Sequence, residues 1–137
     1  MSVDILAQQK EVQIFFKTQS PVYVWGDEFK TEQIMTNYLT NALNHVKNEN
    51  KIDIQIKEEL DVVRVSVFNT GDPIPTEELD KIWIKFYKID KARTREYGGS
   101  GIGLSIVKAI TDSMNQSCGV KNYTNGVMFW FTMDKAK

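Results

Sequence analysis

The sequence is poor in several features that would mark particular classes of protein. It has one cysteine, Cys118, among 137 residues, which allows no internal disulfide and no cysteine-based zinc site. No apolar run approaches the roughly 18 residues of a membrane span, and the N-terminus lacks the charged-then-apolar order of a signal peptide. Neither sign of charge dominates, because 17 Lys and Arg stand against 18 Asp and Glu, whereas nucleic-acid-binding domains usually have a basic excess. We therefore expect a soluble, cytoplasmic domain with no nucleic-acid partner.

Internal repeats, low-complexity tracts and Pro/Gly/Ser-rich linkers are also missing. The composition is otherwise that of a globular protein, with 42% apolar and 26% charged residues, and the length suits one domain with a real core. We expect residues 1–10 to be a lead-in from a preceding region and residues 11–137 to form the domain itself.

Hydrophobic periodicity predicts a mixture of strands and helices. Short apolar runs, some of them alternating with polar residues, predict strands, and apolar residues recurring every three or four positions predict helices. The expected strands are residues 12–16, 22–25, 52–56, 63–67, 117–122 and 127–132, and the expected helices are residues 27–47, 76–83 and 102–114. Because strands and helices alternate in blocks, the sequence predicts an α+β fold of the two-layer sandwich type.

Local signals predict where these elements begin and end. Asp27 is suited to cap the first long helix, and Thr76 to cap the short one. Residues 58–61 predict a hairpin turn, and Asn125-Gly126 predicts the turn of the last hairpin. Residues 88–100 are charged and then glycine-rich with no period, so we expect a long loop there.

Three asparagines share one face of the first long helix. At about 100° per residue, Asn37, Asn41 and Asn44 fall within one sector at the border of the apolar stripe. Asparagine is a poor residue in mid-helix, because its side chain competes for backbone hydrogen bonds. The face is either a solvated polar surface or a ligand site, and a neutral amide oxygen is a reasonable ligand for Mg²⁺.

Two further segments combine a strand or helix end with glycine. Asn69 to Pro75 follows a strand and, taken alone, predicts a tight turn with a rigid exit. Residues 98–104, Gly-Gly-Ser-Gly-Ile-Gly-Leu, open a helix whose N–H groups could face a phosphate. The run lacks the Lys-Ser/Thr ending of a P-loop and departs from the spacing of a dinucleotide-binding fingerprint.

Taken in order, four segments resemble the ATP-binding catalytic domain of bacterial sensor histidine kinases, in the superfamily shared with gyrase, MutL and heat-shock chaperone ATPases. The segments are Asn37–Ala42, Asn69–Pro75, the aromatic box 82–87 with the following residues 88–93, and the glycine-rich residues 99–104. The similarity runs from Glu11 to Met133. It implies a Bergerat-type ATP-binding fold, in which a mixed, mostly antiparallel sheet is covered on one face by about three helices.

The resemblance also implies the cofactors, ATP and Mg²⁺, and a role for each matched residue. Asn41 would ligate Mg²⁺ and Asn37 would position phosphates or water, so both would be catalytic. His45 would lie against adenine, Asn69 would accept from its amino group, and Gly71 would let the backbone pass close to the base. The remaining nucleotide-binding candidates are Asn44, Ile74, the lid cations Lys88 and Arg93, the hinge glycines Gly99, Gly101 and Gly103, and the neighbouring Ile102 and Leu104.

The sequence departs from the family pattern at three positions. Asn44 stands where the family often has a lysine, Asn69 where it has an aspartate, and Val127 where a threonine near the adenine is common. Each change removes a charge or a hydrogen-bonding group expected at the nucleotide, so we expect weaker nucleotide binding than the family pattern gives.

The function implied by the resemblance is that of a protein-histidine kinase in a two-component system. The domain would present the γ-phosphate of Mg·ATP to a histidine on a separate dimerisation domain, and a response regulator would then receive the phosphate. The full-length protein is expected to be membrane-anchored and homodimeric, and this fragment monomeric. His45 is not expected to be the phosphoacceptor, because Val46-Lys47 does not supply an acidic neighbour. The alternatives are a serine kinase of the anti-sigma-factor type and a non-catalytic nucleotide-sensing module.

Overall fold

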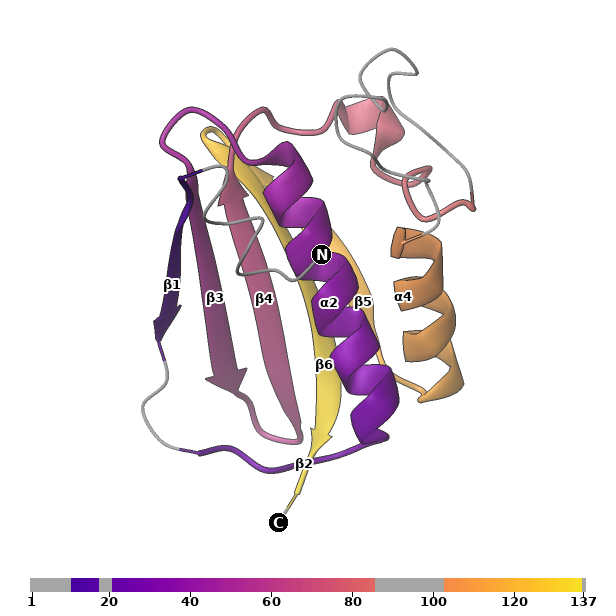
Figure 1. The fold of residues 1–137 in the computed structure, drawn as a ribbon. Helices are drawn as coiled ribbons and strands as arrows, with labels where there is room; N and C mark the ends of the chain where they lie inside the picture. Colours follow the sequence, from indigo (N-terminus) through magenta and orange to yellow (C-terminus); the bar gives the residue numbers. More distant parts are fainter. Residues whose placement is uncertain (1–10, 18–20, 86–102, 137) are drawn as a thin grey trace.

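The computed structural model describes residues 11–17, 21–85 and 103–136 (Figure 1). The elements in chain order are β1 (Gln13–Lys17), β2 (Val24–Trp25), α2 (Glu28–His45), β3 (Lys51–Glu58), β4 (Val62–Thr70), the 3₁₀ helix η1 (Thr76–Glu78), α4 (Gly103–Ser113), β5 (Cys118–Tyr123) and β6 (Gly126–Lys135). Helices α2 and α4 lie side by side over one face of the sheet. Within these ranges no helix is long and apolar enough to cross a membrane.

The sheet has six strands in the order β1-β3-β4-β6-β2, and β5 pairs with β6. β1 runs parallel to β3, and all the other pairs are antiparallel. β6 is long enough to pair with β5 over its first half and with β2 at its end, so β1 and β2 lie at opposite edges. The prediction of an α+β fold with a mixed, mostly antiparallel sheet is confirmed. Of the expected helices, the described residues contain two α-helices and one short 3₁₀ helix.

Helix α2 begins where its capping residue predicts. The Asp27 carboxylate accepts a hydrogen bond from the backbone N–H of Lys30 at 3.0 Å, which satisfies a donor that the helix itself cannot use. The residues that α2 buries against the sheet and α4 are Ile34, Tyr38, Ala42 and Leu43. The sheet meets them with Ile52 and Ile54 of β3, Val67 of β4, and Phe129, Phe131 and Met133 of β6. This core fixes α2 along the middle of the sheet, with its C-terminal half toward the end of β4 (Figure 1).

Two local predictions are wrong. The short helix predicted from residue 76 is a single 3₁₀ turn followed by further turns, and the residue before it is Pro75, so Thr76 does not cap it. The last hairpin turns at Thr124-Asn125 rather than at Asn125-Gly126, because Gly126 already pairs with Tyr123 as the first residue of β6. This first position of β6 requires glycine, because a Cβ there would lie 2.1 Å from the carbonyl oxygen of Asn69.

The hydroxyl of Tyr38 ties α2 to the middle of the sheet. It donates to the backbone carbonyl oxygen of Trp130 at 2.8 Å, and its buried ring packs against Phe129 and Phe131. Burial raises the pKa of this phenol far above its ordinary value, because the charged form would lose its water. The folded state therefore keeps a proton that the unfolded chain releases at high pH.

We expect Tyr38→Phe to lower the free energy of unfolding at pH 7 by about 1 kcal/mol, the worth of a typical hydrogen bond. In the unchanged protein this free energy should fall above about pH 10, where an unfolded tyrosine ionises, by up to about 1.4 kcal/mol per pH unit. Tyr38→Phe should flatten that fall. Urea unfolding at pH 7 and pH 11 measures both effects, with the exposed Tyr23→Phe as the matched control. If the free energy of unfolding falls equally between pH 7 and pH 11 in Tyr38→Phe and in Tyr23→Phe, the assignment of this pH dependence to Tyr38 is contradicted.

Candidate functional site

Three segments that are distant in the sequence carry the candidate site. They are the C-terminal half of α2 and the segment 69–75 that leaves β4, both toward the top of Figure 1, and the first turn of α4, which lies lower in that view, on the right. The core described above places them there, because α2 and α4 pack on each other while β4 runs beneath α2. Each segment carries one of the motifs singled out in the sequence.

Asn37, on the asparagine face of α2, lies next to the beginning of α4. Asn37, Asn41 and Asn44 are all half-buried, as expected for residues at the border of the apolar stripe. The Oδ1 atom of Asn37 lies 3.4 Å from the position of a Cβ built on Gly103, the first residue of α4. The Nδ2 atom of Asn37 is buried and has no hydrogen-bond partner among the described residues. An amide side chain that lies beside a helix N-terminus with its donor left unpaired fits a site for an anionic ligand.

Asn69 is the next-to-last residue of β4, on the face that α2 covers, and only 2% of it is exposed. Its Nδ2 group donates to the carbonyl oxygen of Thr70 at 3.1 Å. This bond uses the donor end of the amide and leaves the oxygen as the end that can accept from a ligand. Its antiparallel partner in the sheet is Val127, which is also buried, so the two departures from the family pattern are neighbours.

Gly71 brings the backbone close to the end of α2. Its φ is +149°, a conformation that residues with a side chain rarely adopt, and a Cβ there would lie 2.9 Å from the carbonyl oxygen of His45. His45 itself is the last residue of α2 and is exposed. The predicted adenine-side residues Asn69, Gly71 and His45 therefore do come together.

Several bonds that the sequence did not indicate hold the segment 69–75 in place. The Lys47 N–H donates to the carbonyl oxygen of Thr70 at 3.0 Å, and the Lys47 ammonium pairs with the Asp72 carboxylate. The side-chain amide of Asn122 on β5 clamps the backbone of Ile74, accepting from its N–H at 3.0 Å and donating to its carbonyl oxygen at 2.7 Å. Asparagine is uncommon in strands, and this was the one signal in the sequence that could have pointed to Asn122.

The remaining predicted residues divide into two groups. Leu104 is half-buried and packs on the core, and Trp83 of the aromatic box packs edge-on against Phe129 with 5.9 Å between the ring centres. The lid candidates Lys88, Arg93, Gly99, Gly101 and Ile102 lie outside the described residues, as does the expected loop 88–100.

The described residues suit a metal ion that is held mainly by the phosphate oxygens of a bound molecule and by water. The described residues contain no group of three His, Cys, Asp or Glu that could hold a metal ion. A neutral asparagine such as Asn41 could therefore hold Mg²⁺ only together with phosphate oxygens and water, which is the way Mg²⁺ is commonly bound.

Comparison with known proteins agrees with this geometry. The model of the family described as "Histidine kinase-, DNA gyrase B-, and HSP90-like ATPase" matches residues 26–137. Sensor histidine kinase WalK of Bacillus subtilis is 33% identical over 116 residues, which cover 81% of this chain and 19% of that protein. The chain thus spans about a fifth of the length of this relative.

Solved structures extend the similarity to the fold. The nucleotide-free catalytic domain of histidine kinase ThkA superposes with a TM-score of 0.81 at 32% identity, covering 97% of this chain and 88% of that one. ThkA in complex with the response regulator protein TrrA gives 0.76 at 31% identity, over 98% and 38% of the two chains. Full-length ShkA in complex with AMPPNP gives 0.84 at 25% identity, over 98% and 28%. The chain belongs to the histidine kinase-, DNA gyrase B- and HSP90-like ATPases and is an ATP-binding catalytic domain of the sensor histidine kinase type.

Proposed function

We propose that this domain binds Mg·ATP between α2, the segment 69–75 and the start of α4, and presents the γ-phosphate to a histidine on a separate dimerisation domain. The observation that carries the proposal is the side-chain amide of Asn37: its Oδ1 lies beside Gly103 at the N-terminus of α4, and its buried Nδ2 has no hydrogen-bond partner among the described residues. A phosphate oxygen there would accept from Asn37 and from the free N–H groups of the helix, whose N-terminus also carries partial positive charge.

The base would lie at the other end of the site. The Asn69 amide oxygen would accept from the adenine amino group, in the place where the family has an aspartate. The absence of a side chain at Gly71 would let the base approach the backbone, and His45 and Ile74 would flank it. The Asn122 clamp on Ile74 holds this wall of the site before the nucleotide arrives, which lowers the entropy lost on binding.

Asn41 is assigned as the metal ligand, one helical turn beyond Asn37. When bound, Mg²⁺ would neutralise phosphate charge, which is the main requirement of phosphoryl transfer together with positioning. Asn44, Lys88, Arg93, Gly99, Gly101, Ile102 and Leu104 complete the proposed nucleotide site, with the two cations and the glycines in the lid.

The proposed partners are the histidine-bearing dimerisation domain of the same full-length protein and a response regulator. ThkA, whose catalytic domain this chain resembles, has been solved with the response regulator TrrA, which supports the second partner. The full-length protein is proposed to be a membrane-anchored homodimer with this domain on the cytoplasmic side.

Incubation with ³²P-labelled ATP tests the proposed function. The chain alone should acquire no label, because it has one histidine, His45, which is assigned to the nucleotide site. After addition of the dimerisation domain of the full-length protein, label should appear on that domain in acid-labile, base-stable form. Acid-stable label on a serine of a partner would instead support a serine kinase, and nucleotide binding without transfer would support a sensing module. Strong labelling of the chain alone at His45 would also contradict the proposal.

A further inference from the structure

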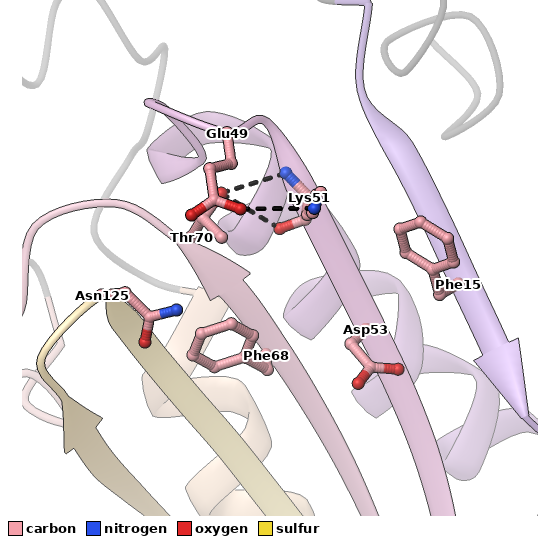
Figure 2. Close-up of a pocket in the computed structure, with 7 residues that line it drawn as sticks. All are labelled: Phe15, Glu49, Lys51, Asp53, Phe68, Thr70 and Asn125. Carbon is pink, nitrogen blue, oxygen red and sulfur yellow. Dashed lines mark hydrogen bonds and ion pairs between the residues drawn. The ribbon is translucent and has the colours of Figure 1, made fainter.

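The face of the sheet turned away from α2 and α4 carries a row of three side chains across three strands. Phe15 of β1 pairs with Asp53 of β3, and Asp53 pairs with Phe68 of β4, so the carboxylate stands between two phenyl rings. Figure 2 shows this row with the helices behind the sheet. A shallow cavity of about 240 Å³ lies over it, and Glu49, Lys51, Thr70 and Asn125 also line it.

The charge of Asp53 is only partly compensated. Its Oδ2 atom accepts from the side-chain amide of Gln55 at 3.1 Å, while its Oδ1 atom is shielded from solvent and has no hydrogen-bond partner among the described residues. The ammonium group of Lys51, which also lines the cavity, pairs with the carboxylate of Glu49 at 3.3 Å, and no ion pair joins it to Asp53 among the described residues. A carboxylate in such surroundings gains from a positive charge brought into the cavity, because few water molecules remain to screen it.

The same face shows how it accommodates cations. The guanidinium of Arg64 lies over the ring of Trp130, 4.2 Å from its centre, and its Nε donates to the carboxylate of Glu59 at 3.4 Å. Gly119 makes room for this arrangement, because a Cβ there would lie 2.5 Å from the Trp130 indole. The site at Phe15, Asp53 and Phe68 repeats the aromatic ring and the carboxylate without the guanidinium.

We propose that this cavity binds the guanidinium group of an arginine side chain from a partner protein. β1 and β4 flank β3, so Phe15 and Phe68 stand on strands roughly 10 Å apart. A planar group stacked between two rings needs roughly 3.5 Å on each side, which this spacing allows. A guanidinium stacks on aromatic faces and pairs with carboxylates better than the compact, strongly hydrated ammonium of lysine. Phe15 is 44% exposed, so the ring is open to a partner. The site lies on the opposite face of the sheet from α2 and α4, and therefore from the proposed nucleotide site (Figure 2).

NMR titration of the ¹⁵N-labelled chain with the peptide acetyl-Gly-Arg-Gly-amide tests this inference. Saturable shifts of the amides of Phe15, Asp53 and Phe68 are expected. The peptide with neutral citrulline in place of arginine should produce none.

Two variants separate the charge from the rings. Asp53→Asn should weaken peptide binding about fivefold through the lost charge, and Phe15→Leu about threefold through the lost ring. Asp61→Asn, which removes an exposed carboxylate elsewhere, should leave binding unchanged. The proposal is overturned if the citrulline peptide, or a peptide with lysine in place of arginine, binds as tightly as the arginine peptide. It is also overturned if Asp53→Asn binds the arginine peptide as tightly as the unchanged protein does, or if free arginine binds more tightly than the peptide.

Discussion

Replacing Gly71 by alanine is expected to destabilise the domain and to remove most of its affinity for ATP. At a φ of +149° an alanine is strained, and its Cβ would lie 2.9 Å from the carbonyl oxygen of His45, a backbone atom that cannot swing aside. Strain and overpacking together should lower the free energy of unfolding by roughly 2–4 kcal/mol. For a chain of this length that corresponds to a fall in melting temperature of about 10 °C.

Thermal unfolding followed by circular dichroism measures the first effect, and calorimetric titration of ATP the second. Asp72→Ala is the matched control, because it changes the next residue, which is exposed, and it removes a surface ion pair with Lys47 rather than creating a backbone clash. That control should cost no more than about 1 kcal/mol. If Gly71→Ala melts at the same temperature as the unchanged protein and binds ATP equally well, the close approach of the two segments does not exist in solution.

The second large effect is expected from Asn41→Leu. If Asn41 ligates Mg²⁺, the variant should bind ATP equally with Mg²⁺ and with excess EDTA. The unchanged protein should bind at least about tenfold more tightly with Mg²⁺, a difference of about 1.4 kcal/mol. Leucine is close to asparagine in size, and the half-buried position borders the apolar stripe of α2, so the fold should be retained.

Gln33→Leu provides the control for this experiment. It makes the same change from a side-chain amide to leucine at an exposed position of the same helix, two turns before Asn41. Its magnesium dependence should equal that of the unchanged protein. An unaltered magnesium dependence in Asn41→Leu would remove this residue from the metal site and would leave Asn37 or Asn44 as the alternatives on the same face.

Much of the fold could be predicted because its signals are local. Alternation of apolar and polar residues gives β3 and β4, and the apolar stripe with Asp27 before it gives α2 nearly to its ends. The position of each strand in the sheet has no local signal. β1 and β2 are close in sequence, yet they pair with β3 and β6 at opposite edges, because pairing is decided by the packing of the whole sheet.

The candidate site shows the same division. The asparagine face of α2 follows from helical periodicity, and the need for glycine at position 71 follows from the turn-like sequence around it. Two contacts of the site join residues far apart in the sequence: Asn37 lies beside Gly103, 66 positions on, and Asn122 clamps Ile74, 48 positions before it. No local sequence pattern indicates either contact. The sequence predicts the last hairpin turn one residue too late, at Asn125-Gly126, because glycine at position 126 signals a turn. The glycine is needed instead for space against Asn69.

The fit between Gly119 and Trp130 restricts the order in which this surface can change during evolution. A side chain gained at position 119 collides with the indole, and the ring can yield only by rotating away from the guanidinium of Arg64. Replacement of Trp130 by a smaller residue must therefore come first, and replacement of Gly119 second, for both steps to be tolerated. We expect descendants of this sequence to exchange the two positions as a pair, and those that keep the tryptophan to keep the glycine.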